Sequence, residues 1–520
     1  MVCCPPAVAV AAHFKMKNKV LLFNPRSADK KYRVPNSILQ IAAAIDGQFE
    51  WVIVDGNRED NPWKKLKAEL DTGSFKYVGF TVMPGPQLKQ AIPLSKTIRQ
   101  EYPEVFMIWG GYFASNQYQT VLDSGWIDYV ISGPGDNAFP NLLKALDLSA
   151  LPNSEEIHAI KNLIFKSNGV IVKTAKEELL DYNKLPRLSY DKLDDFYSME
   201  AYLGKTYLGN KTLAYHSSFG CPFTCSFCAV VPIYNARWKG MSAENVYRDV
   251  KYVKDKWGAD AIEFHDNNFF VSEKRTVEFS RLIRDEGMIW WGEGRIDTID
   301  KYKDESLSAM REAGCKMIFF GAETGNDEVL KKMDKGGTQS AAQILAFAER
   351  MKKFDIIPEY SFVLGTPADT PEEVMAQIDF DIDFIRQVKE VNPDTEIIIY
   401  IYSPVPTEGS EMFQSVLDAG FRFPQHLEDW LNADWENFDL RKNPLTPWLT
   451  PAMIDKIQHF ETVLNAAYPT VSDIRMSRSQ RSLIKTMAKF RYKNKMYHYP
   501  YELKALQKLW KYRQPEIQGF

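Results

Sequence analysis

Short apolar runs alternate with amphipathic stretches along most of the chain. Between residues 18 and 150, the apolar runs fall at Lys19–Asn24, Trp51–Asp55, Tyr77–Thr81, Phe106–Gly110 and Tyr129–Ser132. Helical spacing of apolar residues fills the intervals, as at Ser37–Ile45. Short strands that alternate with helices predict a parallel sheet with helices on both faces. We therefore expect an α/β domain of the flavodoxin-like (Rossmann-like) class over residues 18–150.

A second series of strand–helix units runs from about residue 206 to about residue 415. Its strands are predicted at Thr212–Tyr215, Ala261–Phe264, Trp290–Gly292, Met317–Gly321, Tyr360–Leu364 and Glu396–Ile401. Helices such as Ala243–Trp257 and Glu372–Val388 show the apolar spacing of an outer ring. About six units predict a partial (β/α)6 barrel of the TIM type, with its site at the carboxyl ends of the strands.

The remaining segments carry weaker patterns. Residues 1–17 are expected to be a disordered extension, because the short apolar run Ala7–Ala12 lacks the positive region of a signal peptide. Residues 151–205 are mixed polar and predict a linker that lies over the following domain. Residues 416–520 have helical periodicity and predict an α-helical C-terminal region.

Composition places the chain among ordinary globular proteins. Of its 520 residues, 45% are hydrophobic and 25% are charged. The net charge of −4 gives no sign of general or specific nucleic-acid binding. The six cysteines argue against a disulfide framework and for a reducing compartment, so we expect a cytoplasmic protein.

The most specific motif is a run of three cysteines. Cys221, Cys225 and Cys228 follow the spacing C-x3-C-x2-C, with the aromatic Phe227 just before the last cysteine. Three thiolates on one short loop can hold three irons of a cubane [4Fe–4S] cluster. The fourth iron then lacks a protein ligand and can bind a substrate.

A zinc site is the alternative to a cluster. His216 lies close enough upstream to supply a fourth zinc ligand. Zinc motifs usually contain a second Cys or His pair, however, and the other cysteines are only Cys3, Cys4 and Cys315. The spacing therefore favours the cluster.

The cysteine loop resembles the signature of the radical S-adenosylmethionine (SAM) superfamily. That resemblance implies that SAM binds the open iron and is cleaved to a 5′-deoxyadenosyl radical, with electrons from a flavodoxin- or ferredoxin-type donor. It also implies that polar residues at the strand ends contact SAM. Asp266 and Asn268 would approach the methionine amine, and Arg295 would lie near the carboxylate or the ribose. Glu323 and Thr324 would contact the ribose. Gly365 and the segment Tyr402–Pro404 would border the adenine.

Each of these residues has a simpler explanation as a helix cap or turn former. Phe227 would pack against the cluster or the adenine, or simply into the core. His265, at the end of one predicted strand, could act as a base, contact the substrate or serve only as a hydrogen-bonding residue.

The loops at one edge of the first predicted sheet point to a second ligand. Asn24, the pair Gly110 and Gly111, and the run Gly133-Pro134-Gly135-Asp136 follow three of its strands. Glycine there permits close backbone approach to a ligand, and parallel sheets bind ligands at this edge. The segment resembles the cobalamin (B12)-binding domain that often precedes a radical SAM core.

The predicted cobalamin domain contains no histidine between residues 18 and 150. The resemblance therefore implies that the lower face of cobalt is open or meets a non-histidine group from Pro25–Pro35 or Val82–Gln87. The radical SAM enzymes of this type most often methylate an unactivated carbon or phosphorus. One SAM methylates cobalt and a second generates the radical that abstracts hydrogen.

The resemblance therefore implies a methyltransferase that acts on a small molecule, such as a natural product or a lipid. Oxidative cyclisation or rearrangement without methyl transfer is the alternative on the same scaffold, and a zinc-stabilised, non-catalytic binding protein is a more distant one. From Arg475 onward, Lys and Arg outnumber acidic residues and alternate with tyrosines. An RNA contact, a peripheral membrane contact or a solvated basic face that closes the barrel would each fit this stretch.

Overall fold

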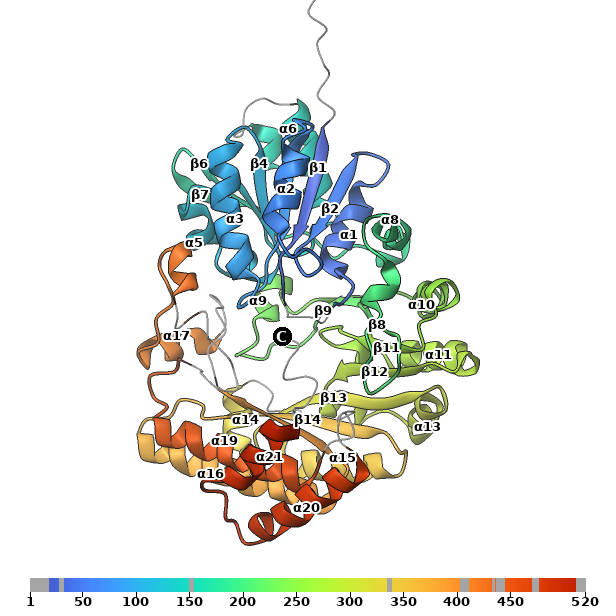
Figure 1. The fold of residues 1–520 in the computed structure, drawn as a ribbon, viewed down its shortest axis with the longest axis vertical. Helices are drawn as coiled ribbons and strands as arrows, with labels where there is room; N and C mark the ends of the chain where they lie inside the picture. The colour runs from blue at the N-terminus through green and yellow to red at the C-terminus, as the bar shows by residue number, and fades with distance from the viewer. Residues whose placement is uncertain are drawn as a thin grey trace, which may run out of the picture.

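The fold has two large sheets, one mainly and one wholly parallel, one above the other, and a helical C-terminal region at the lower end (Figure 1). The computed structural model describes residues 18–27, 32–148, 154–333, 339–402, 411–432, 435, 445–469 and 477–510. The predicted disordered extension at residues 1–17 lies outside the described residues, as do residues 403 and 404 of the predicted adenine border.

The first sheet has seven strands in the order β2-β1-β3-β4-β5-β6-β7, of which β1 to β5 are parallel. Those five are β1 (Lys19–Asn24), β2 (Trp51–Asp55), β3 (Phe75–Thr81), β4 (Phe106–Gly110) and β5 (Tyr129–Ile131). Alternate residues of the strands pack on opposite faces, because Leu22 and Ile108 join the core under α1 and α6, whereas Phe80 and Trp109 join the core under α2 and α3. These helices are α1 (Asn36–Ile45), α2 (Pro62–Leu70), α3 (Leu88–Glu101) and α6 (Ala138–Leu148). The predicted α/β domain is confirmed.

Part of the predicted linker belongs to this sheet. The strands β6 (Leu163–Ser167) and β7 (Val170–Lys173) extend it in antiparallel fashion beyond β5. They are joined by Asn168 and Gly169, which both have positive φ. An Asn-Gly pair between two apolar runs is a typical signal for a two-residue hairpin, and the sequence analysis overlooked it.

The second sheet consists of six parallel strands in the order β15-β14-β13-β12-β11-β8. They are β8 (Thr212–Tyr215), β11 (Ala261–Phe264), β12 (Ile289–Gly294), β13 (Cys315–Glu323), β14 (Ile357–Leu364) and β15 (Glu396–Ile401). The outer helices are α10 (Ala243–Trp257), α11 (Glu273–Ile283), α13 (Asp304–Glu312), α15 (Ala341–Lys352) and α16 (Pro371–Val391). The edge strands β8 and β15 do not pair with each other, which confirms the predicted partial barrel.

The C-terminal region is helical, as predicted. Its main helices are α17 (Glu411–Asp418), α19 (Pro451–Ala467), α20 (Arg478–Lys493) and α21 (Tyr501–Trp510). α19 packs on α16 and β15, and α20 and α21 pack on α19. Among the described helices, none has the length and apolar character needed to cross a bilayer.

Shorter elements complete the described part of the chain. They are α4 (Tyr112–Asn116), α5 (Tyr118–Asp123), α7 (Glu155–His158), η1 (Tyr182–Lys184), α8 (Tyr190–Phe196), η2 (Met199–Tyr202), β9 (Ser218–Gly220), α9 (Val230–Tyr234), β10 (Trp238–Gly240), η3 (Phe269–Val271), η4 (Arg284–Glu286), α12 (Ile296–Ile299), α14 (Asp327–Lys332) and η5 (Leu427–Leu431). β9 and β10 form an antiparallel pair that leads into and out of the cysteine loop.

Candidate active site between the two sheets

The carboxyl ends of both sheets border a shared space, where α9 and β9 lie (Figure 1). Two adjoining cavities occupy it, of about 280 Å³ and about 190 Å³. Both are lined by Ser37, Gln40, Thr81, Gly111, Gly133, Phe219 and Tyr234, so they form one continuous site.

The smaller cavity lies in the first domain, between the strand ends and helices α1 and α6. All four predicted glycines, Gly110, Gly111, Gly133 and Gly135, line it. Gly111 has φ +90, and a Cβ there would lie 2.9 Å from backbone atoms of Val82. Only glycine fits at residue 111, and the four glycines leave room for a ligand above the sheet.

Asn24 does not line either cavity. Its side-chain amide donates to Asp55 Oδ1 at 2.9 Å, and the hydroxyl of Tyr202 donates to Asp55 Oδ2 at 2.7 Å. Burial raises the pKa of Asp55 above its ordinary value. Asn24 therefore helps to satisfy a buried carboxylate beside the strand ends, and its predicted contact with cobalamin stays a prediction.

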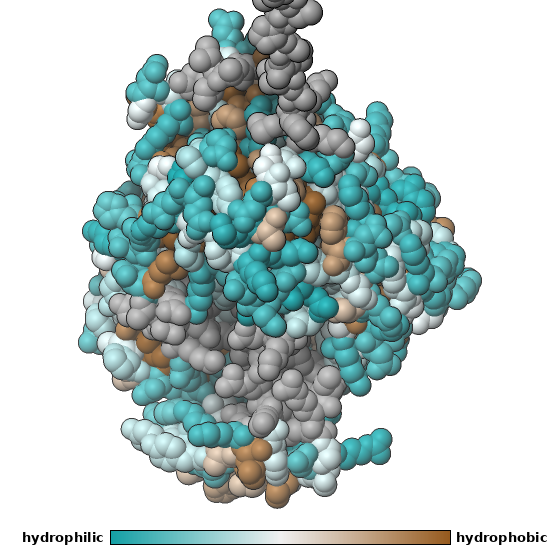
Figure 2. All heavy atoms as spheres, turned by 45° about the horizontal axis from the view of Figure 1, so that its top comes forward, coloured by the Kyte–Doolittle hydropathy of each residue, from teal (hydrophilic) through white to brown (hydrophobic). Residues whose placement is uncertain are grey.

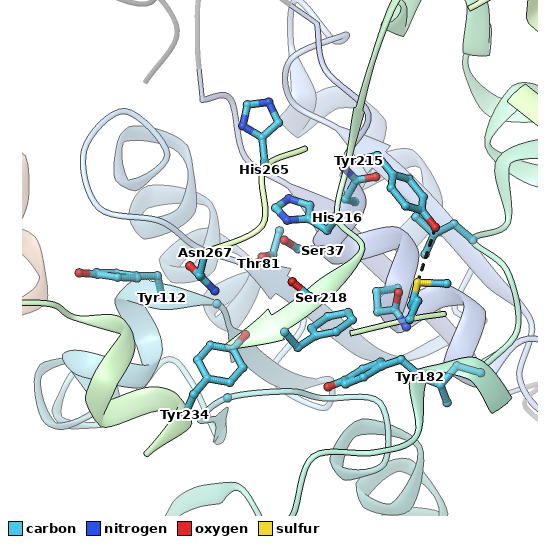
Figure 3. A pocket seen from close by; sticks show the side chains of 18 of the residues that line it. Ser37, Thr81, Tyr112, Tyr182, Tyr215, His216, Ser218, Tyr234, His265 and Asn267 are labelled. Carbon is cyan, nitrogen blue, oxygen red and sulfur yellow. Dashed lines mark hydrogen bonds between the residues drawn. The ribbon is translucent and has the colours of Figure 1, made fainter. Parts of the chain in front are cut away.

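The larger cavity is lined by both domains and by the segment between them (Figure 3). Thr81 and Tyr112 come from the first domain, and His216 and His265 come from the second. Tyr182, from the predicted linker, also lines it and stacks on Phe219 with ring centroids 3.7 Å apart. Nothing in the sequence pattern around Tyr182 marks it as a ligand contact.

A group of charged side chains connects the two domains beside this cavity. Arg33, from the loop before α1, contacts both Glu263 of β11 and His265, the latter at 2.7 Å. Burial raises the pKa of Glu263, but Arg33 and His265 outweigh it and lower this pKa to about 2. Burial lowers the pKa of His265, but Glu263 and Glu293 outweigh it and raise this pKa above its ordinary value. The domains are therefore held together by an ionised pair next to a readily protonated histidine.

His216 differs from His265 in its electrostatic surroundings. Its ring is exposed toward the cavity and lies 6.1 Å from the His265 ring. Partial desolvation at the cavity wall and the neighbouring histidine lower the pKa of His216 below its ordinary value. Within the described residues, no group of three or more His, Cys, Asp or Glu side chains is arranged to hold a metal ion.

The cysteine loop is fixed by backbone contacts at both ends. Gly220 precedes it with φ +76, and a Cβ there would meet the carbonyl oxygen of Arg237, the residue just before the paired strand β10. The backbone N–H of Ser226 donates to the carbonyl of Met333 at 3.0 Å, and that of Cys228 donates to the carbonyl of Cys225 at 3.0 Å. Cys221, Cys225 and Cys228 form no disulfide, and Phe227 is half-buried.

Two predicted SAM contacts lie beside these thiols. The guanidinium of Arg295 donates to Cys225 Sγ at 3.0 Å, and Asp297 holds it from the other side at 2.7 Å. Asn268 lies next to Cys221, and both of its side-chain polar atoms are buried without a hydrogen-bond partner in the described chain. Burial raises the pKa of the Cys221 thiol. An orphaned amide beside three thiols is the arrangement that a polar ligand would complete.

Asp266 supports the backbone that leads into the cysteine loop. It is fully buried and accepts hydrogen bonds from the backbone N–H of Ser217 at 3.1 Å and from the hydroxyls of Ser217 and Ser218. Ser217 and Ser218 lead into β9 and then into the cysteine loop. Asp266 thus positions that loop, and its contact with a methionine amine stays a prediction.

The end of β13 is held in an unusual conformation. Glu323 has φ +65, and the strand register shifts between Gly321 and Glu323. The hydroxyl of Thr324 donates to Asp381 Oδ1 of α16 at 2.6 Å. Burial raises the pKa of Asp381 to about 6, although hydrogen bonds from Thr324 and Gly325 oppose the rise. Asp381 was not among the predicted site residues. It holds Thr324, one of the predicted ribose contacts, in place through this hydrogen bond.

Asp381 gives the protein a measurable pH dependence. Its folded-state pKa of about 6 lies above the ordinary value of 3.8, so the folded state binds more protons between these pH values. The stability that Asp381 confers falls as the pH rises through that window, by about 3 kcal/mol in total. Asp381→Asn removes this pH dependence of the free energy of unfolding. The difference in unfolding midpoint between wild type and variant will therefore change between pH 4 and pH 7. A constant difference would contradict the raised pKa.

Gly365 and Tyr402 are covered by the C-terminal region. The indole N–H of Trp448 donates to the Gly365 carbonyl at 3.0 Å, and a Cβ on Gly365 would lie 2.7 Å from Leu449 Cδ2. The rings of Tyr402 and Trp448 lie 5.9 Å apart. The strand ends β14 and β15 are thus closed by Trp448 and Leu449, a contact that the sequence pattern did not indicate.

Comparison with known proteins identifies the class of this site. Residues 215–380 match the family description "Radical SAM superfamily", and residues 32–143 match "B12 binding domain". The chain is a radical SAM enzyme with an N-terminal B12-binding domain.

Three similar proteins illustrate the relationship. An uncharacterised methyltransferase of Pyrococcus horikoshii, PH0819, is 28% identical over 382 residues, which are 71% of this chain and 79% of that protein. The anaerobic magnesium-protoporphyrin IX monomethyl ester cyclase of Rubrivivax gelatinosus is 24% identical over 439 residues, covering 81% and 70%. The structure of the radical SAM methyltransferase TsrM from Kitasatospora setae has the same fold, with a TM-score of 0.61, 18% identity and coverage of 78% and 77%.

The cofactors of this enzyme are a [4Fe–4S] cluster, SAM and cobalamin. The residues present fit all three. The cysteine loop carries three cysteines without a disulfide, beside a guanidinium and a buried amide, which suits a cluster and a polar ligand on it. The glycine-lined cavity at the carboxyl edge of the first sheet continues into the space between the domains, which suits a large flat cofactor.

Proposed function

We propose that the protein is a methyltransferase that adds a methyl group to an unactivated carbon, or phosphorus, of a small molecule. The observation that carries the proposal is the continuous cavity, which joins the B12-binding domain to the strand ends next to the cysteine loop. The similarity to PH0819 and to TsrM, both named as methyltransferases, supports the same reaction.

In this proposal, Cys221, Cys225 and Cys228 are the three protein ligands of the cluster. Asn268 faces the amino acid end of SAM, and Arg295 supplies positive charge next to Cys225. Glu323 and Thr324, held by Asp381, meet the ribose, and Gly365 and Tyr402 border the adenine under Trp448. When bound, the cofactors supply a 5′-deoxyadenosyl radical from the cluster side and a transferable methyl group from the cobalamin side.

The B12-binding domain holds its cofactor through shape more than through ion pairs. Gly110, Gly111, Gly133 and Gly135 provide the floor of the groove, together with Asp136, whose pKa burial raises to about 6. Met83 lines the larger cavity from the first domain and is 48% exposed. It lies within the predicted segment Val82–Gln87, so a thioether rather than an imidazole would face the lower side of the cobalt.

The protein is also proposed to work in the cytoplasm with an external donor of the flavodoxin or ferredoxin type. Cys221, Cys225, Cys228 and Cys315 form no disulfide, which suits a reducing compartment. The donor would supply the electron that starts each cleavage of SAM.

The mass of the product tests the proposal. With a cognate small molecule, the reconstituted enzyme is expected to yield a product heavier by one CH2, and deuterated-methyl SAM is expected to pass its label to that product. Cyclisation or rearrangement, the reaction type suggested by the cyclase relative, would give no added carbon and would contradict methyl transfer.

Arg295 offers a test of where the cluster lies. A cation beside a thiolate favours the reduced, more negative cluster, so Arg295→Gln is expected to make its reduction potential more negative and SAM cleavage slower. Arg295→Lys keeps the charge and is the matched control, with a smaller shift. Redox titration followed by EPR spectroscopy measures both variants. Equal potentials in all three proteins would place the cluster away from Arg295.

A further inference from the structure

Helix α20 has a buried face and an exposed apolar face. Ile484, Ala488 and Tyr492 are buried, at the spacing of one helical stripe. Leu483, Met487 and Phe490 also share one face, at spacings of four and three residues, yet they are 51%, 38% and 66% exposed. α20 therefore presents a second apolar stripe to solvent.

The stripe is part of a larger surface. We define the α20–α21 surface by its exposed apolar side chains, Leu483, Met487, Phe490, Met496, Tyr499, Tyr501 and Leu509. These are seven of the eleven exposed large hydrophobic side chains among the described residues. Apolar side chains gather at the lower end of the molecule in Figure 2, the end that carries α20 and α21 in Figure 1. Such clustering on a surface marks a binding face rather than chance exposure.

The same surface is strongly basic. Residues 477–510 contain nine Lys or Arg residues and one Glu, although the whole chain has a net charge of −4. Lys489 and Lys493 are exposed and lie on the turns of α20 next to the apolar stripe. Arg491 is paired with Glu502, and Lys495 is paired with Asp383 at 2.7 Å.

We propose that the α20–α21 surface binds an anionic lipid bilayer. A helix with Leu, Met and Phe on one exposed face and lysines beside it is the arrangement of a helix that lies in the membrane interface. Tyr499 and Tyr501, whose rings stack 5.7 Å apart, add the amphipathic aromatic residues that concentrate at such interfaces. The basic residues supply attraction to anionic head groups.

Other partners fit this surface less well. A second copy of the chain would bring two surfaces with the same excess of positive charge together. An acidic electron donor would suit the charge, but α19 and α16 separate α20 from the barrel, and the cysteine loop lies near α9 in the middle of the molecule (Figure 1). RNA would pair with the lysines and leave the aliphatic stripe of Leu483 and Met487 without a role.

Vesicle sedimentation tests the proposal with the full-length, cofactor-loaded protein. Vesicles of phosphatidylcholine with phosphatidylglycerol are expected to retain the protein, whereas phosphatidylcholine alone retains little. Leu483→Ser/Phe490→Ser removes the largest apolar contacts and is expected to weaken retention at least tenfold. Lys489→Glu/Lys493→Glu is expected to weaken it by roughly tenfold or more, because each basic residue near an anionic surface contributes about 1 kcal/mol.

Matched controls separate this surface from general effects. Lys64→Glu/Lys65→Glu on α2 makes the same change in net charge at exposed positions of the first domain, and Val170→Ser removes an exposed apolar side chain from β7 of the same domain. Both controls are expected to bind vesicles like wild type, and circular dichroism checks that all variants are folded. Equal binding to neutral and anionic vesicles would overturn the proposal. So would control substitutions that weaken vesicle binding as much as the substitutions on the α20–α21 surface. So would a dimer, an RNA complex or a flavodoxin complex that is lost with the same substitutions while vesicles are never bound.

Discussion

Replacement of Cys221, Cys225 and Cys228 by alanine is expected to abolish SAM cleavage completely. The triple variant loses all three proposed iron ligands, while the loop stays anchored by its backbone hydrogen bonds to Met333 and Cys225. It is expected to be colourless after anaerobic reconstitution, to contain no iron and to form no 5′-deoxyadenosine above background. Iron analysis and chromatography of the SAM products measure this.

The control for this variant is Cys315→Ala. Cys315 also forms no disulfide, but it is buried in the core on β13, away from the loop. That variant is expected to keep its iron and its activity, although its stability falls because a small cavity forms. Cobalamin binding is expected to persist in the triple variant, because none of the three cysteines lines the glycine-rich groove. Residual SAM cleavage in the triple variant would show that the cluster, and with it the radical chemistry, is held elsewhere.

Closing the glycine-lined groove is expected to have the second largest effect. Gly110→Phe puts a ring into that cavity, because the residue lines it and a Cβ there would meet nothing closer than 3.9 Å. Cobalamin retention is expected to fall by roughly 100-fold, since the ring occupies space that the cofactor needs. Absorbance of bound cobalamin after gel filtration measures the loss.

Gly110→Phe should leave the second domain intact. Iron content and formation of 5′-deoxyadenosine are expected to stay near the wild-type level, whereas transfer of a methyl group is lost. Lys65→Phe adds the same ring at an exposed position of α2 and serves as the control. Unchanged cobalamin retention in Gly110→Phe would place the cofactor outside this groove.

Much of the fold follows from local pattern, and its strands show why. Apolar runs such as Trp51–Asp55 and Ala261–Phe264 form strands with those bounds, because strands buried on both faces need continuous apolar side chains. The hairpin at Asn168 and Gly169 was also predictable from the sequence, because an Asn-Gly pair between two apolar runs favours a two-residue turn.

The site was only partly predictable. Glycines 110, 111, 133 and 135 come together because parallel strands end at one sheet edge. Tyr182 could not be found, because its stacking on Phe219 depends on how a segment crosses between two domains. The same holds for Trp448 over Gly365 and for Arg33 against Glu263, contacts that join distant parts of the chain.

Asp266 and Asp381 show the limit of motif-based prediction in another way. Both are buried carboxylates that position neighbouring residues, Asp266 through Ser217 and Ser218, and Asp381 through Thr324. A polar residue at a strand end can face a ligand itself, or it can support a neighbouring segment of backbone that faces the ligand. Only the hydrogen bonds of the folded structure distinguish the two.

Analysis of the SAM products formed by the anaerobically reconstituted enzyme tests the central claim most directly. A reducing agent and SAM are added to protein that carries both iron and cobalamin. The account predicts two products, 5′-deoxyadenosine from radical cleavage and S-adenosylhomocysteine from methyl transfer, with the second lost in Gly110→Phe and the first lost in the triple cysteine variant. Formation of 5′-deoxyadenosine without any S-adenosylhomocysteine, in protein that retains cobalamin, would contradict the proposed methyltransferase.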